Sequence, residues 1–255
     1  MLAKQEKTLV SIIVRTKDRP ELLKRALKSI ASQTYRPLEA VIVNDGGCDL
    51  PVEELRAILS DVFFRYIRLD KNQGRASAGN IGIKNAGGVY IGFLDDDDEF
   101  YFDHVSTLVN VLSNSAHRVA YTDSEIIHYE YSTEKRDFIV KDRHILFSEE
   151  FSYEKLLLSN YIPLMCLLFD VGLKQDLKFD NRFDLFEDWD LLIRLAEKYP
   201  FQHIKSVTAK YNHKCWRYCR LDEQRLRCPY HYKRDKLSDR QSDMGLGSLV
   251  YRASL

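Results

Sequence analysis

The chain has 255 residues, with 38 Lys and Arg residues balanced by 38 Asp and Glu residues, so its formal net charge at pH 7 is zero. This length is enough for one large domain or a domain with an appendage, and the 45% hydrophobic content excludes wholesale disorder. The neutral balance argues against a nucleic-acid partner, and the absence of an apolar run near the roughly 20 residues of a membrane span leads us to expect a cytoplasmic protein.

The first half of the sequence alternates strand and helix patterns. Apolar, β-branched runs predict strands at residues 9–14, 40–43, 63–69 and 89–94, and helical spacing of apolar residues predicts helices at 20–30, 52–59 and 75–85. This alternation predicts an α/β domain with a mainly parallel sheet and flanking helices. Ligands bind at the carboxyl ends of strands in such sheets, and both Asp45 and the acidic run Asp95–Glu99 directly follow predicted strands.

The second half is less regular. We predict a strand at 119–121, a hairpin formed by 125–131 and 138–140, a helix at 151–158, a buried strand at 164–169, a helix at 189–198 and a strand at 201–211. Beyond residue 211 the sequence becomes basic and aromatic, and no element is predicted there.

The four consecutive aspartates Asp95–Asp98 repel one another unless a positive charge lies between them. Mg²⁺ and Mn²⁺ suit such a site, because they prefer oxygen ligands and accept few protein carboxylates when phosphate oxygens complete the shell. On an extended segment Asp95 and Asp97 point to the same side. The alternative is a solvated acidic loop or helix N-terminus, but the position after a buried strand favours the cation site.

Several short motifs occur together in order along residues 8–213. The motifs are Val10–Thr16, Ser32–Thr34, Glu39–Gly47, Asn72–Gly74 with Asn80–Gly82, Tyr90–Asp98 and Glu187–Leu191. Together they resemble the motifs of the family 2 glycosyltransferases. The resemblance implies the GT-A (Rossmann-like nucleotide-diphospho-sugar transferase) fold. It also implies transfer of a hexosyl or N-acetylhexosaminyl group from a nucleotide-diphosphate sugar with inversion, aided by Mn²⁺ or Mg²⁺.

The resemblance also assigns roles to single residues. Asp188 matches the general base, Glu187 and Trp189 are the expected acceptor-binding residues, and the expected metal ligands are Asp95, Asp97 and His213. The expected nucleotide-binding residues are Arg15, Thr16, Asp45, Arg75 and Asp96. Arg15 stands where the family often has proline. Non-catalytic alternatives remain open for three of these assignments. Glu187 and Asp188 could be an acidic pair that only stabilises a helix N-terminus through the helix dipole. Arg75 could be a solvated helix residue, and His213 could be structural.

The expected reaction is a single in-line displacement from a donor, most commonly a UDP sugar, onto a hydroxyl of a glycan or lipid-linked glycan, as in surface polysaccharide assembly. The Gln-x-x-Arg-Trp signature of processive synthases is missing, which favours single additions. A degenerate nucleotide-sugar-binding or scaffold subunit is one alternative. A sugar-phosphate nucleotidyltransferase is another, although the loop Arg15–Arg19 lacks the glycines that it would need.

Residues 1–213 are the expected transferase domain, with a nucleotide-sugar-binding half at 8–123, an acceptor-binding half at 124–213 and a basic extension at 214–255. Residues 214–240 hold nine Lys and Arg and four acids, so their net charge is +5. The segment could contact anionic lipid at the inner face of the membrane, form a basic wall for a diphosphate, or pack as an ordinary tail. A zinc site is a weaker alternative, because the spacing is unusual for its residues Cys215, Cys219, Cys228 and His231.

Overall fold

A computed structural model gives the fold, and it describes residues 8–132, 135 and 137–215. The described residues fall into two compact units, a large one of residues 8–126 with 144–212, and a small one of the described residues in 127–143 with 213–215. The proposed lipid-contacting segment from residue 216 onward lies outside the described residues, as do Cys219, Cys228 and His231 of the zinc alternative.

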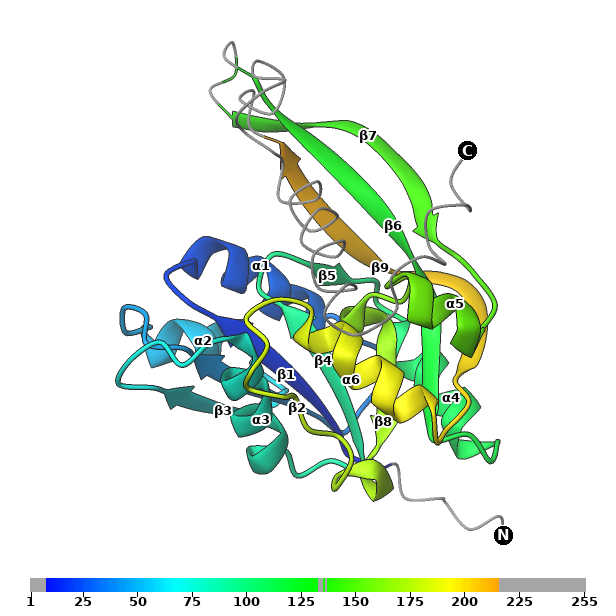
Figure 1. The fold of residues 1–255 in the computed structure, drawn as a ribbon. Coiled ribbons are helices and arrows are strands. Elements are labelled where there is room, and N and C mark those ends of the chain that lie inside the picture. The colour runs from blue at the N-terminus through cyan, green and yellow to red at the C-terminus, as the bar shows by residue number, and fades with distance from the viewer. Residues whose placement is uncertain (1–7, 133–134, 136, 216–255) are drawn as a thin grey trace, which may run out of the picture. The chain divides into compact units, whose positions relative to one another are not determined.

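The first half of the large unit follows the predicted alternation (Figure 1). Its elements are β1 (Val10–Thr16), α1 (Pro20–Ala31), β2 (Leu38–Asn44), α2 (Val52–Ile58), β3 (Phe63–Arg68), α3 (Arg75–Asn85) and β4 (Tyr90–Asp95). The four strands pair in parallel in the order β3-β2-β1-β4. All seven predicted elements are therefore confirmed, with ends that differ by at most two residues.

The register brings the carboxyl ends of three strands to one edge. Thr16 of β1 pairs with Asn44 of β2, and Arg15 pairs with Asp95 of β4. The strand order places the β1-β2 and β2-β3 crossovers on one face of the sheet and the β3-β4 crossover on the other, because parallel crossovers are right-handed. Helices α1 and α2 thus cover one face, and α3 covers the opposite one.

The second half of the chain adds strands in antiparallel pairings, so the sheet as a whole is mixed. Its elements are β5 (Glu99–Phe100), α4 (His104–Ser113), β6 (Val119–Ser132), β7 (Asp137–Phe147), α5 (Tyr153–Leu158), the 3₁₀ turn η1 (Leu164–Cys166), β8 (Leu167–Asp170), the 3₁₀ turn η2 (Val171–Leu173), α6 (Glu187–Ala196) and β9 (Gln202–Cys215). Strand β8 pairs antiparallel with both β4 and β6.

Three differences from the sequence expectations have local causes. The strand predicted at 164–169 begins with a 3₁₀ turn, in which Cys166 N donates to Pro163 O, and only its second half pairs with the sheet. The predicted hairpin is confirmed as β6 and β7, but both strands are longer than predicted. Strand β5 has two residues, too few to give a periodic pattern, and forms by pairing with β9.

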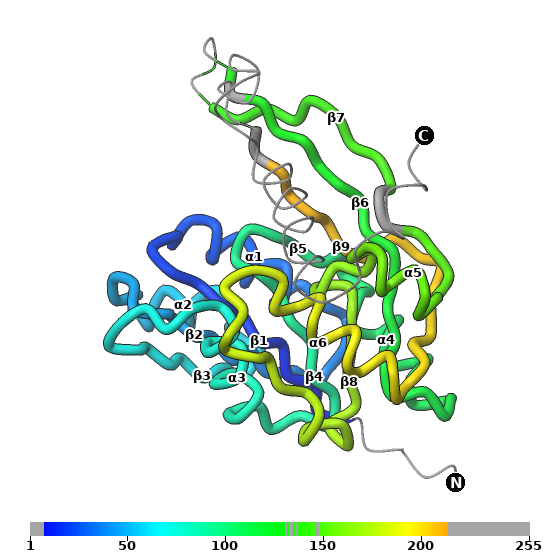
Figure 2. Tube along the Cα trace, in the orientation of Figure 1, coloured from blue at the N-terminus to red at the C-terminus, as the bar shows by residue number. Residues whose placement is uncertain are grey.

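The core of the large unit lies around β1, β2 and β4, whose residues are almost all buried. Phe93 of β4 packs edge-to-face against both Phe169 and Phe179, with ring centroids 6.2 and 5.4 Å away. The path of the chain through these layers is followed in Figure 2. None of the helices in the described ranges is long and apolar enough to cross a membrane.

Candidate functional site

Asp45 follows β2 directly and holds the loop that precedes α3. Its two carboxylate oxygens accept hydrogen bonds from the backbone N–H groups of Gln73, at 2.7 Å, and Gly74, at 3.0 Å. The loop after β2 depends on Gly46 and the loop before α3 depends on Gly74, because their φ values of +72° and +88° are costly for residues with a Cβ. Asp45 thus ties the end of β2 to the start of α3 at the carboxyl edge of the sheet.

The acidic run leaves the sheet at the end of β4. Asp95 is the last residue of the strand, and Asp96 is completely buried, with its Oδ2 accepting from Thr16 Oγ1 at 2.6 Å. Burial raises the pKa of Asp96 to about 6, although the hydrogen bond from Thr16 opposes that effect. The predicted neighbours Thr16 and Asp96 are therefore in direct contact.

Arg19, which the sequence analysis did not single out, pairs with two of these aspartates. Its Nη1 donates to Asp97 Oδ2 at 2.9 Å, and its Nη2 lies 2.7 Å from Asp96 Oδ1. The second contact is an ion pair without a hydrogen bond, because the N–H group does not point at the oxygen; Asp96 Oδ1 has no hydrogen-bond partner among the described residues. The only sequence signal was a second arginine in the loop after β1.

Arg15 is the centre of a buried charge cluster. Its guanidinium lies 2.7 Å from Asp95 Oδ1 and 3.1 Å from Glu187 Oε1. The guanidinium carbon also lies over the Phe179 ring, 5.6 Å from the ring centroid. Burial by itself would lower the pKa of Arg15, but the charges of Asp95 and Glu187 outweigh it, so the pKa is raised. In the same way, desolvation would raise the pKa of Asp95, but Arg15 and Arg75 lower it. Arg15 and Asp95 therefore remain charged near neutral pH.

Glu187 starts α6 and is completely buried between two arginines. Besides Arg15, it pairs with Arg75 at the start of α3, whose Nη2 lies 2.8 Å from Glu187 Oε1. Helices α3 and α6 pack against each other. The charge cluster therefore links β1, β4, α3 and α6, which are far apart in the sequence.

The next two residues of α6 differ in their surroundings. Asp188 is partly exposed; its Oδ1 accepts from Trp189 N, and its Oδ2 lies 3.5 Å from Asn160 Nδ2, the outer limit of a hydrogen bond. The Trp189 ring is buried, and its Nε1 donates to Leu156 O of α5 at 2.6 Å. Only Asp188 of the Glu187–Trp189 segment presents its polar group to solvent.

The last predicted residue, His213, belongs to the small unit. Its Nδ1 lies 3.3 Å from Nδ1 of His128, and burial together with His128 lowers its pKa. The preceding residue, Asn212, belongs to the large unit and holds the acidic loop: its N–H donates to Asp98 Oδ1 at 2.9 Å, and its Nδ2 donates to Asp97 O at 3.0 Å. The role of Asn212 was not predicted, since an asparagine in a strand carries no distinctive signal.

The acidic run suits a divalent cation that brings most of its own ligands. Asp95 and Asp97 present partly exposed carboxylate oxygens, which are hard donors of the kind that Mg²⁺ and Mn²⁺ prefer. Within the described ranges, no three His, Cys, Asp or Glu side chains are arranged to enclose a metal ion. Two such carboxylates fit a cation that takes its remaining ligands from phosphate oxygens or water.

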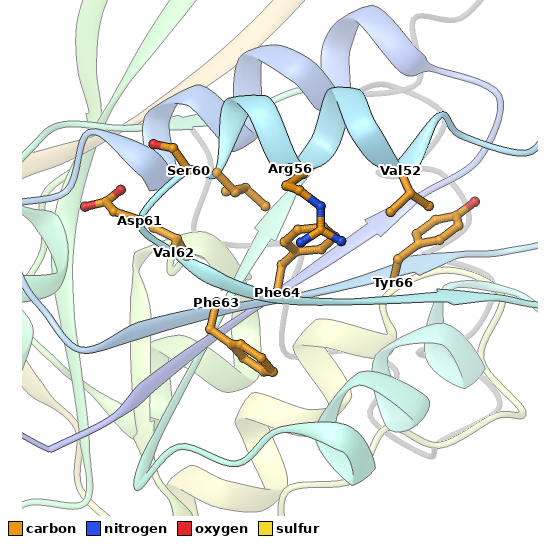
Figure 3. A pocket seen from close by; sticks show the side chains of 9 residues that line it. Val52, Arg56, Ser60, Asp61, Val62, Phe63, Phe64 and Tyr66 are labelled. Carbon is orange, nitrogen blue, oxygen red and sulfur yellow. The ribbon is translucent and has the colours of Figure 1, made fainter.

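A separate surface pocket of about 660 Å³ lies between α2 and β3 (Figure 3). Its lining includes Arg56, Phe64 and Tyr66, and it contains none of the predicted site residues. Arg56 lies over the Phe64 ring, 5.8 Å from its centroid. The pocket belongs to the outer edge of the sheet and not to the carboxyl edge where the aspartates gather.

Curated relatives of this chain are glycosyltransferases. The chain is 29% identical over 203 residues to the uncharacterized glycosyltransferase YwdF of Bacillus subtilis, covering 79% of this chain and 73% of that protein. It is 32% identical over 204 residues to RC0461 of Rickettsia conorii, covering 80% of this chain and 32% of the relative. It is 27% identical to the putative colanic acid biosynthesis glycosyl transferase WcaA of Escherichia coli, covering 75% and 67%.

Solved structures share the fold at low identity. TarS 1–349 of S. aureus superposes with a TM-score of 0.65 at 16% identity, covering 80% of this chain and 60% of that one, and TarS structures are also known with UDP and UDP-GlcNAc. The mannosyltransferase PcManGT of Pyrobaculum calidifontis, in complex with GDP-Man and Mn²⁺, matches with a TM-score of 0.60 at 16% identity, covering 92% and 62%. These likenesses establish the GT-A fold that the motifs imply.

The chain spans about three quarters of the B. subtilis relative but about a third of the R. conorii one. The profile of the family described as "Glycosyl transferase family 2" matches residues 11–174, which is most of the large unit. With the ordered motifs, the GT-A fold and the glycosyltransferase relatives all in agreement, the chain belongs to glycosyl transferase family 2.

Proposed function

We propose that this glycosyltransferase is metal-dependent and inverting, and that it moves a sugar from a nucleotide-diphosphate donor, with UDP sugars the first to test, to an acceptor hydroxyl. The observation that carries the proposal is the gathering of Asp45, Asp95 and Asp97 at the carboxyl edge of β1, β2 and β4. The UDP-, UDP-GlcNAc- and GDP-Man-bound structures of fold relatives support a nucleotide-sugar donor.

We assign the nucleotide to the loops that Asp45 and Thr16 organise. Asp45 holds the turn before α3 through two backbone N–H groups, so it shapes the base and ribose pocket even where it does not touch the ligand itself. Thr16 and the buried Asp96 line the neighbouring ribose side. Arg15 and Arg75 carry positive charge behind the diphosphate, and their pairing with Glu187 holds that charge in place.

Asp95 and Asp97 are the residues that would hold Mn²⁺ or Mg²⁺. The ion would neutralise negative charge that develops on the departing nucleoside diphosphate. His213, the third metal ligand that the family resemblance implies, belongs to the small unit and stays a prediction. Mn²⁺ accompanies GDP-Man in the structure of PcManGT, which supports a divalent cation in this fold.

Asp188 is the proposed general base. Its carboxylate is partly exposed at the first turn of a rigid helix, where it can accept the proton of an acceptor hydroxyl as that oxygen attacks the anomeric carbon. Attack from the face opposite the leaving diphosphate inverts that carbon. Glu187 and Trp189 are buried on either side, so we propose that they support the acceptor site from behind by fixing α6.

Our proposals for the acceptor and for the biosynthetic role rest on the sequence. We propose a glycan or lipid-linked glycan acceptor, as in surface polysaccharide assembly, with a nucleotide-sugar-binding half at 8–123, an acceptor-binding half at 124–213, and peripheral membrane contact through the basic extension from residue 214. The relative WcaA, named for colanic acid biosynthesis, supports the polysaccharide setting. We also propose the cytoplasmic location that the sequence leads us to expect.

A binding screen tests the proposal directly. Thermal unfolding of the full chain is followed with UDP, GDP and their sugar conjugates, each with Mn²⁺, with Mg²⁺ and with EDTA. A nucleoside diphosphate that raises the melting temperature only when a divalent cation is present supports the proposal. Failure of every nucleotide to bind under all three conditions contradicts it.

A further inference from the structure

Arg19 lies beside the acidic run and is paired with two of its aspartates. It precedes α1, pairs with Asp97 at 2.9 Å and Asp96 at 2.7 Å, and its side chain is 46% exposed. Asp97 is itself 41% exposed. An ion pair between such exposed groups is weak, with a typical contribution near zero to 1 kcal/mol. The guanidinium can therefore leave Asp97 at little cost when a better partner arrives.

The contact with Asp96 differs from that with Asp97, because the Asp96 carboxylate is buried. Asp96 is completely buried, and its Oδ1 has no hydrogen bond within the described part of the chain, although Arg19 lies close to it. A buried carboxylate oxygen with a cation nearby but no hydrogen bond is incompletely compensated. Arg19 thus donates a hydrogen bond to Asp97 and pairs with Asp96 through charge alone.

A divalent cation at Asp97 and the Arg19 guanidinium repel each other, since both are positive and would contact the same carboxylate. A bound diphosphate offers Arg19 an alternative, because its oxygens match the planar fork of a guanidinium in a bidentate pair. The loop Arg15–Arg19 has no glycine and cannot wrap a phosphate with backbone N–H groups as a glycine-rich loop does. An arginine side chain can bind a phosphate without such a loop.

We propose that Arg19 is a diphosphate-binding residue that exchanges partners. Without donor, it neutralises Asp97 and competes with the divalent cation for that carboxylate. When cation and donor bind together, the cation takes Asp97 and Arg19 moves to the diphosphate. The inference rests on the proposed function, because it needs a nucleotide diphosphate and a cation at the same edge of the sheet.

The exchange predicts effects of opposite sign, which a purely structural ion pair would not produce. Arg19→Gln removes the competitor, so the affinity for Mn²⁺ alone rises about 3- to 5-fold, the factor expected from loss of exposed ion pairs. The same variant loses a charged phosphate contact, so the affinity for UDP or GDP in saturating Mn²⁺ falls about 10-fold or more. Arg19→Lys keeps the charge but not the fork; it leaves Mn²⁺ affinity near wild type and weakens diphosphate binding several-fold.

Lys24→Gln is the matched control. It removes the same charge from the same region, but Lys24 pairs with Glu21 and Glu54 and not with the acidic run. Mn²⁺ binding is measured on the full chain by electron paramagnetic resonance of the free ion, and UDP and GDP binding by titration calorimetry. Thermal unfolding of each variant establishes that it is folded, and Arg19→Lys carries the test if Arg19→Gln does not fold.

Each outcome is decisive. Opposite shifts in Arg19→Gln, absent from Lys24→Gln, support the exchange. If Arg19→Gln weakens both ligands, or changes neither while wild type binds UDP or GDP, the exchange is wrong and the proposed function stands. If wild type binds neither UDP nor GDP with Mn²⁺, the proposed function falls and the exchange falls with it. If Mn²⁺ affinity rises and diphosphate affinity is unchanged, Arg19 is only a counter-ion of Asp97 and the proposal is overturned.

Discussion

The buried charge cluster around Glu187 gives a quantitative prediction. Glu187→Gln keeps the size and shape of the side chain but removes a negative charge that is completely buried between Arg15 and Arg75. Arg15 is only 6% exposed, so the excess positive charge cannot be relieved by moving into water. We therefore expect the substitution to destabilise the folded chain and not merely to remove a contact.

The magnitude follows from the geometry. Breaking a buried ion pair by removing one partner costs about 3–5 kcal/mol. Arg15 keeps Asp95 at 2.7 Å, and the partly exposed Arg75 can turn toward solvent, so the lower end applies. We expect a loss of about 3 kcal/mol in the free energy of unfolding, which corresponds to a fall of roughly 6–12 °C in melting temperature for a domain of this size.

Asp190→Asn is the matched control, because it makes the same carboxylate-to-amide change in the first turn of the same helix. Asp190 pairs with Arg194 four residues later, and both side chains are partly exposed. We expect a loss of at most about 0.5 kcal/mol. Unfolding in urea, followed by circular dichroism, measures both free energies.

Two results would refute the reasoning. One is a loss of less than about 1 kcal/mol in Glu187→Gln, which would mean that the cluster is solvated or readily rearranged. The other is equal losses in Glu187→Gln and Asp190→Asn, which would make the effect a property of α6 and not of burial. A cycle with Arg15→Gln checks the pairing: the double variant should be clearly less destabilised than the sum of the two single variants.

Further predictions concern the turn, the acidic run and the base. Gly46→Ala should lower the free energy of unfolding, measured in urea titrations, by about 2 kcal/mol or more, because its Cβ would lie 2.3 Å from the backbone of Asn72. Gly74→Ala also has a positive φ but no atom within 4 Å of its Cβ, so it should lower this free energy by only about 1 kcal/mol. Equal losses in the two variants would contradict the clash. The pKa of Asp96, about 6, exceeds its unfolded value, so its favourable contribution is present below about pH 4 and is lost as the pH rises through 6. Asp96→Asn should therefore match wild type at pH 4 and be more stable at pH 7, by up to about 3 kcal/mol; a pH-independent difference would argue against this. Asp188→Asn should bind donor within about 3-fold of wild type but lose about 100-fold or more of transfer, and retained turnover would exclude it as the base.

Much of the architecture is predictable because strand and helix patterns are local. Residues 9–94 alternate apolar runs and amphipathic stretches, and each predicted element of this part forms in the structure. The antiparallel second half is less predictable: β5 is two residues long and forms by pairing with β9, about a hundred residues later. Such an element has no signal of its own before the chain has folded.

The candidate site divides along the same line. The sequence by itself determines that Asp45 and Asp95 follow buried strands, and parallel pairing then requires their side chains to lie at one edge of the sheet. It does not determine their partners. Only the tertiary structure decides that Arg15 joins Asp95 to Glu187, which follows Arg15 by 172 residues in the sequence. Only the tertiary structure also decides that Glu187 is buried while its neighbour Asp188 is partly exposed. Position along a strand or helix follows from local periodicity, whereas the neutralisation of a charge depends on which distant segments the fold brings within a few ångströms.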